Sequence, residues 1–173
     1  HSDGVSAEHG FVSMLPMSNG RTFISWLDGR YSGQSKTHTG AHASNGMTLR
    51  AGIFSGEGEK TAVWELDDLV CDCCQTSSAM TGSGPVVVYR NRTTEEVRDT
   101  YITRLVDEQW SVPIAVHEDN WQIDGCPVNG PAVSSGGGLT VVAWFTAKND
   151  YPKVSFVLSQ DDGETFGAPV IVA

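Results

Sequence analysis

The sequence predicts an all-β chain made of three repeated units, each a four-stranded antiparallel sheet. Three segments align with one another: Gly20–Trp26, Gly84–Tyr89 and Gly138–Trp144. Each begins with a turn glycine and continues as a β-rich run that ends on an aromatic residue, and the aromatic ends are 63 and 55 residues apart. A period near 50 residues that holds several strands is typical of a β-propeller blade. We therefore expect three blades within one partial propeller domain.

Each repeat contains four short runs rich in β-formers, separated by Gly, Asn, Asp and Ser. The domain spans 1–173, and its blades have approximate bounds of 9–70, 71–117 and 118–173. In the first blade we expect strands at Phe11–Leu15, Thr22–Trp26, Met47–Ile53 and Ala62–Leu66. In the second they are Ser77–Met80, Val86–Tyr89, Thr100–Leu105 and Ser111–Val116. In the third they are Ala132–Ser134, Leu139–Phe145, Lys153–Leu158 and Pro169–Val172. No stretch has a convincing helical period.

Composition limits the classes of function. The 173 residues suffice for one domain, and the formal net charge of −10 argues against nucleic acid or an anionic membrane as a partner. No apolar run approaches the length of about 18 residues that a membrane helix needs. The even number of cysteines, 4, fits disulfide formation in an exported protein, periplasmic or extracellular, although the sequence contains no signal peptide.

One motif lies between the third and fourth predicted strands of the last blade. Its form is Ser-x-Asp-x-Gly-x-Thr-aromatic, given by Ser159, Asp161, Gly163, Thr165 and Phe166. A short Asp side chain can accept hydrogen bonds from turn N–H groups, and Gly permits a positive φ. The pattern resembles the Asp-box, or bacterial neuraminidase repeat, of sialidase-like propellers. In that superfamily the motif is structural, so it implies a hairpin staple rather than an active site.

The resemblance covers all three repeats. Trp26–Arg30, Cys71–Cys74 and Cys126–Pro131 are similar to segments in a bacterial branch of sialidase-like proteins. It implies that the three blades are part or half of a six-bladed propeller, since three blades do not readily close a ring. The expected partner is then a second copy in a homodimer or the missing remainder of the ring.

The repeat alignment also predicts which residues share a face. In a propeller, the loops between strands 2 and 3 lie on the same face as the loops from strand 4 to the next strand 1. Nearly all the unusual polar residues of this chain belong to those loops, and the Asp-box belongs to the opposite face. The long connection 28–46 contains His38 and His42 and is predicted to be functional or mobile.

The first hypothesis for this face is glycosidic. Sialidase-like enzymes hold a sugar carboxylate with arginines, and the resemblance implies an exo-glycosidase for acidic sugars, with an acidic or neutral glycan as ligand. Arginine binds carboxylates in bidentate fashion. Glycoside cleavage usually depends on a pair of carboxylates, and a tyrosine nucleophile is a known exception. The Arg-Ile-Pro motif of true sialidases is absent, and each arginine can instead form an ion pair. The candidate catalytic residues are Asp28, Arg30, Arg90, Arg98, Asp99 and Tyr151, with Arg92 as a further cation.

The second hypothesis is a non-enzymatic, ligand- or metal-binding propeller. Cys73 and Cys126 occupy equivalent places, each six residues before the alanine of a first strand, so they are expected to be neighbours on adjacent blades. Thiolates with imidazoles suit copper or zinc. A disulfide from Cys126 to one of the other three cysteines, or free thiols, are the alternatives. The candidate metal ligands are Cys71, Cys73, Cys74, Cys126 and His9, which His38 and His42 can join.

Overall fold

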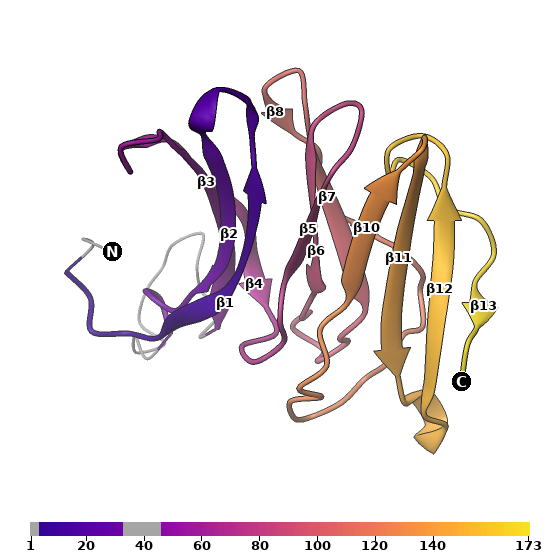
Figure 1. The fold of residues 1–173 in the computed structure, drawn as a ribbon. Coiled ribbons are helices and arrows are strands. Elements are labelled where there is room, and N and C mark those ends of the chain that lie inside the picture. Colours follow the sequence, from indigo (N-terminus) through magenta and orange to yellow (C-terminus); the bar gives the residue numbers. More distant parts are fainter. Residues whose placement is uncertain (1–3, 33–45) are drawn as a thin grey trace.

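Three antiparallel sheets stand side by side in the computed structural model, which describes residues 4–32 and 46–173 (Figure 1). The first sheet has the order β1 (His9–Pro16), β2 (Thr22–Asp28), β3 (Met47–Phe54), β4 (Lys60–Val70). The second has the order β5 (Ser77–Met80), β6 (Pro85–Arg90), β7 (Thr100–Val106), β8 (Gln109–Trp110), and β9 (Ile114–Ala115) also pairs with β7. The third has the order β10 (Ala132–Gly136), β11 (Leu139–Thr146), β12 (Lys153–Ser159), β13 (Val170–Ile171). The predicted all-β fold of three four-stranded blades is confirmed.

The core lies in the two spaces between the blades. Strand β6 is buried along its whole length, and its side chains alternate between the two neighbouring sheets. Val87 and Tyr89 pack with the first blade, whereas Val86 and Val88 pack with Val142 and others of the third. A fully buried side chain of this size contributes about 1.5–3 kcal/mol. The unbroken apolar run of β6 is therefore explained by a strand that is covered on both faces.

The first strands of the three blades are neighbours. Strand β5 lies beside both β1 and β10. The Thr76 hydroxyl donates to the Phe11 carbonyl at 2.7 Å, and the Val133 N–H donates to the Ser77 hydroxyl at 3.2 Å. These bonds link consecutive blades along their first strands, as expected when the first strand of each blade is the innermost one.

Two fourth strands differ from the prediction. Strand β4 continues past Leu66 to Val70 through irregular pairing with β3, so the two acidic residues Asp67 and Asp68 do not end it. In the second blade, the predicted strand Ser111–Val116 keeps only β9 (Ile114–Ala115), and β8 (Gln109–Trp110) lies before the predicted strand. Pro113 lies between β8 and β9, and it has no N–H to donate to a ladder.

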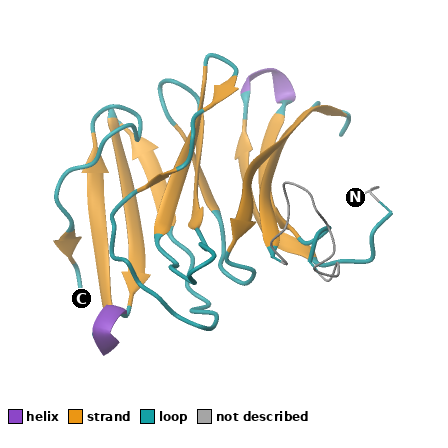
Figure 2. Cartoon of the chain, turned by 180° about the vertical axis from the view of Figure 1, so that it is seen from behind, coloured by secondary structure: helices purple, strands orange, loops and turns teal. Residues whose placement is uncertain are grey.

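The connections emerge at two opposite ends of the sheets (Figure 2). We call one end of the sheets the loop face: β2 ends and β3 begins there, and it carries the β6–β7, β11–β12, β4–β5 and β9–β10 connections. It is the lower edge in Figure 1. No helix in the described ranges 4–32 and 46–173 is long and apolar enough to span a membrane. His38 and His42 lie outside the residues that the structure describes.

The Ser-x-Asp-x-Gly-x-Thr-Phe segment forms the turn between β12 and β13, at the end opposite the loop face. Asp161 accepts hydrogen bonds from the Ser159 hydroxyl at 2.7 Å and from the Thr165 N–H at 2.9 Å. Gly163 has φ +85°, and a Cβ there would lie 2.8 Å from Ile102 of the second blade. Phe166 packs against the core between the second and third blades. The segment is thus held by its own side chains and joins two blades.

Candidate functional site

Asp28 ends β2 on the loop face, and its buried carboxylate is surrounded by donors. Arg30 binds it through Nε and Nη2 at 2.8 and 2.7 Å, and the Trp26 indole donates at 2.9 Å. His9 Nε2 lies 3.1 Å away and Arg50 Nε 3.9 Å away. Burial alone raises the pKa of Asp28, but the hydrogen bonds from Arg30 and Trp26 outweigh it and hold the pKa well below its usual range. Asp28 is therefore an ionised anchor for its neighbours.

Arg90, at the end of β6, is 2% exposed and binds backbone rather than a carboxylate. Its Nε donates to the backbone carbonyl of Asn129 at 2.9 Å. Nη1 donates to the backbone carbonyl of Arg98 at 2.6 Å, and Nη2 to that of Phe145 at 2.8 Å. The guanidinium also lies 5.3 Å from the centre of the Trp121 ring. These contacts join segments of the second and third blades, and they occupy all three guanidinium nitrogens.

Arg98 and Asp99 follow on the same connection. Arg98 donates to Glu96 at 2.6 Å and to the Cys71 sulfur at 3.1 Å, and Arg92 also binds Glu96. Asp99 accepts the N–H groups of Asn120 and Trp121 at 2.8 and 3.0 Å. Burial raises the pKa of Asp99. Asp99 thus fixes the shape of the loop that follows β9.

The six predicted catalytic residues therefore occupy three places on the loop face. Asp28 pairs with Arg30 in the first blade, and Arg90, Arg98 and Asp99 are grouped in the second. Tyr151 directly follows η2 (Lys148–Asp150) of the third blade and is 68% exposed. The structure does not bring them together as one arginine clamp around one acid.

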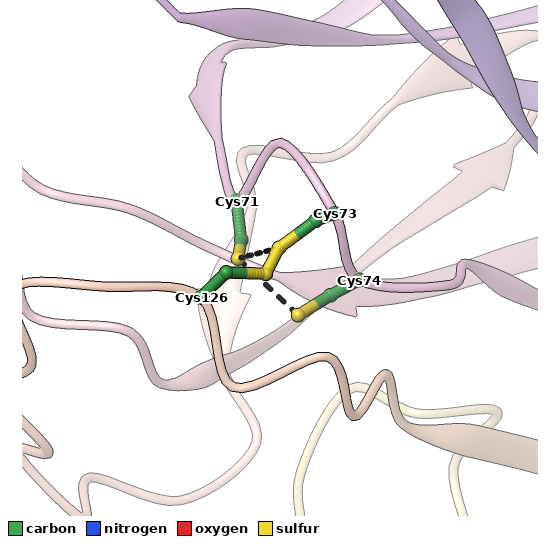
Figure 3. Close-up of side chains that lie close together, drawn as sticks. All are labelled: Cys71, Cys73, Cys74 and Cys126. Atoms are coloured by element: carbon green, nitrogen blue, oxygen red, sulfur yellow. Dashed lines mark hydrogen bonds between the residues drawn. A yellow bond between two sulfur atoms is a disulfide. The ribbon is translucent and has the colours of Figure 1, made fainter.

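The four cysteines meet at one point (Figure 3). Cys73 and Cys126 form a disulfide with Cα atoms 6.4 Å apart, which confirms the predicted proximity of Cys126 to the Cys71–Cys74 segment. Cys71 and Cys74 are buried free thiols with sulfurs 3.2 Å apart. Their mutual hydrogen bond lowers the pKa of Cys71 to about 6, helped by Arg98, and raises that of Cys74. His9 is placed elsewhere: its ring contacts Asp28 and the Ala7 carbonyl.

A pocket of about 480 Å³ opens on the loop face, between η2 and the loop after β9. Three residues beside it, Asn120, Asn149 and Asp150, have positive φ values of 53°, 56° and 57°. Asn and Asp tolerate this left-handed conformation, which lets the chain turn tightly on both sides of the pocket. The lining consists largely of amides and charged groups: Asn120, Trp121, Gln122, Ile123, Ala147, Lys148, Asn149 and Asp150.

A second pocket, of about 400 Å³, contains acids that the sequence did not single out. It is lined by Glu65, Asp67 and Asp68 of β4 together with Tyr101 and others. The Tyr89 hydroxyl donates to Asp67. Burial raises the pKa of Asp67 although this hydrogen bond opposes it. The alternation of acidic and apolar residues in Glu65–Asp67 was the available signal, but it also fits an ordinary solvated strand.

Comparison with known proteins gives no sequence relative. No family model matches the chain, and no curated protein matches it. Among solved structures, the chain is similar to a GH32 β-fructofuranosidase of Bombyx mori in complex with sucrose, with a TM-score of 0.44 and 12% sequence identity. The similarity covers 90% of this chain, which spans 35% of the length of that one.

Proposed function

We propose that this chain is part of a carbohydrate-active, sialidase-like propeller and binds a glycan on its loop face. The observation that carries the proposal is the 480 Å³ pocket beside η2. Its volume falls in the range of about 300–1,000 Å³ that is usual for small-ligand sites. The Asp-box pattern of the β12–β13 turn supports the family assignment, and the Cys73–Cys126 disulfide supports an exported location.

The chemistry of the pocket lining suits a sugar. Amide side chains both donate and accept hydrogen bonds, so Asn120, Gln122 and Asn149 can match the hydroxyl groups of a sugar ring. Lys148 adds a cation that can pair with the carboxylate of an acidic sugar, as a point charge rather than a bidentate fork. We propose an acidic sugar as the preferred ligand and a neutral sugar as a weaker one.

The predicted arginines act by a different route in this proposal. Arg90 holds the carbonyls of Asn129 and Phe145, and Asp99 holds the N–H groups of Asn120 and Trp121. Arg90 also stacks on Trp121, so both residues act on the pocket wall through Asn120 and Trp121 instead of touching the ligand. Tyr151, which directly follows η2, is the predicted catalytic residue nearest in sequence to the lining.

The experiment is a calorimetric titration of the chain with a sialic acid, a uronic acid and a neutral hexose. We expect saturable binding of an acidic sugar, and Lys148→Ala is expected to weaken it about tenfold, or 1.4 kcal/mol. The affinity of Lys148→Ala for the neutral sugar should stay close to that of the wild type. Arg21→Ala is the matched control, because Arg21 lies at the opposite end of the sheets, beside η1 (Ser18–Gly20). Absence of binding by all three sugars would overturn the proposal.

Glycoside hydrolysis is a second candidate, favoured by the acidic pocket. General acid catalysis needs a carboxyl group with a raised pKa near a second, ionised carboxylate. Asp67 has a raised pKa, and Glu65 and Asp68 line the same pocket. The test is hydrolysis of a chromogenic glycoside by the wild type, Asp67→Asn and Lys148→Ala. Activity that is lost in Asp67→Asn and kept in Lys148→Ala would assign the reaction to this pocket. A chain without turnover on acidic and neutral glycosides would exclude this candidate.

A further inference from the structure

Four sulfur atoms gather at one point between the second blade and the loop that leads to the third (Figure 3). Cys71, Cys73 and Cys74 come directly after β4, and Cys126 comes from the connection between β9 and β10. All four sulfurs lie within 4.8 Å of one another. The Cys71 sulfur is 3.2 Å from that of Cys74 and 4.0 Å from that of Cys73. A disulfide needs only two of these sulfurs, so the position of the other two requires a separate explanation.

The spacing fits a tetrahedral metal site. Zinc binds four thiolates at about 2.3 Å, which places the sulfurs about 3.8 Å apart along the edges of a tetrahedron. The Cys71–Cys74 and Cys71–Cys73 separations of 3.2 and 4.0 Å lie on either side of that value. Cys71 and Cys74 also have the Cys-x-x-Cys spacing that is common among zinc ligands.

The surroundings supply positive charge. Arg98 donates from Nη1 to the Cys71 sulfur at 3.1 Å. Arg90, which is 2% exposed, interacts electrostatically with Cys71 and Cys74, while its hydrogen bonds go to three backbone carbonyls. Four thiolates around one divalent zinc carry a net charge of about −2. Two buried guanidinium groups balance that charge, and N–H donors to ligating sulfur are the outer contacts that metal sites use.

We propose that the reduced cluster binds one Zn²⁺ through Cys71, Cys73, Cys74 and Cys126, and that the Cys73–Cys126 disulfide is the metal-free, oxidised form of the same site. A dithiol or phosphine reductant supplies two electrons, the S–S bond breaks, and two thiols form while the reductant is oxidised. Zn²⁺ then binds the four sulfurs as thiolates, and the cysteines that are still thiols release their protons into water. Cys126 stays tied to the end of β4 in both states. The geometry thus gives a zinc site controlled by the redox state of one disulfide.

The test compares the untreated chain with the chain reduced anaerobically by a phosphine. Each is titrated with Co²⁺, whose visible and charge-transfer bands report tetrahedral thiolate ligation, and then with Zn²⁺. We expect one Co²⁺ per reduced chain with a four-sulfur spectrum, complete displacement by Zn²⁺, and no such spectrum before reduction. A reduced, folded chain that gives no thiolate–cobalt bands would overturn the proposal.

Two variants separate ligation from folding. Cys74→Ser keeps the Cys73–Cys126 disulfide, so the oxidised chain can be checked for its fold by circular dichroism, and after reduction it is expected to lose the four-sulfur spectrum. Arg98→Gln removes the donor to Cys71 and is expected to weaken Zn²⁺ binding about 10–100-fold. His9→Ala is the control, since His9 contacts Asp28 rather than the cysteines. An unchanged cobalt spectrum in Cys74→Ser would contradict the four-cysteine assignment.

Discussion

Removing the Cys73–Cys126 disulfide should be among the most destabilising changes in this chain. The bond closes a sequence separation of 53 residues, which runs through the whole second blade. In the chain-entropy description, a loop of this length constrains the unfolded state by about 4 kcal/mol at 25 °C. That amount is a large fraction of the 5–15 kcal/mol that holds a typical domain folded. We therefore expect the double variant Cys73→Ser/Cys126→Ser to lose about 4 kcal/mol of unfolding free energy.

The measurement is urea unfolding followed by tryptophan fluorescence, with and without a phosphine reductant, in the presence of a chelator. The reductant should lower the midpoint of the wild-type chain toward that of the double variant and leave the variant unchanged. The single variant Cys74→Ser, which keeps the bond, is the control and should remain sensitive to the reductant. A double variant within about 1 kcal/mol of the wild type, a quarter of the expected effect, would refute the reasoning.

Three further predictions concern carboxylates. Asp161→Ala should lower the melting temperature without changing sugar affinity, because Asp161 binds only its own turn and lies opposite the loop face; an unchanged melting temperature with lost affinity would contradict this. Asp28→Asn should cost about 2–3 kcal/mol at neutral pH, since it leaves buried donors without their charged acceptor. The pKa of Asp28 is depressed in the folded chain, so its stabilising contribution is present above about pH 4 and is lost as the pH falls through the folded pKa. Acid unfolding of the wild type and of Asp28→Asn measures this difference. Asp67→Asn should be more stable than the wild type at neutral pH and equal to it below about pH 4. The reason is that the raised pKa of Asp67 makes the stability of the wild type fall as the pH rises. Asp68→Asn is the control, and a destabilised Asp67→Asn would show that the folded chain prefers the ionised form.

The repeat pattern was sufficient to predict the blades because strand alternation and turn residues are local properties. Val86–Val88 follows a turn glycine, and burial on both faces allows the run to be continuously apolar. The same alignment placed Cys126 near Cys73, because equivalent positions on adjacent blades are neighbours in space. The predicted strand Ser111–Val116 was too long, because it ran through Pro113, which cannot donate to a ladder.

The roles of the arginines could not be predicted in the same way. Arg90 binds the carbonyls of Asn129 and Phe145, which are 39 and 55 residues away in the sequence. Every residue carries the same backbone carbonyl, so no sequence motif predicts which carbonyl an arginine will bind. The acidic pocket could not be predicted either, because its character depends on the burial of Asp67 in a pocket shared with Tyr101 and not on sequence spacing.

The outer faces of the first and third blades lead to a last prediction about assembly. The middle blade is covered on both sides, whereas the outer faces expose apolar residues: Val12 at 51%, Met14 at 64%, Leu139 at 40% and Leu158 at 43%. Exposed apolar patches larger than a few hundred Å² usually mark interfaces, and these side chains lie on the two outer faces where further blades would pack.

We predict that this surface is covered either by the other blades of a longer ring or, in the isolated chain, by a second copy that completes six blades. Light scattering above micromolar concentration should then give twice the 18.6 kDa chain mass. Leu158→Lys should shift the mass toward the monomer, because a charge would be buried where the two copies meet. Val112→Lys is the control, since Val112 is already 82% exposed on the middle blade. A wild-type chain that stays monomeric well above micromolar concentration would exclude the dimer and leave only the longer ring.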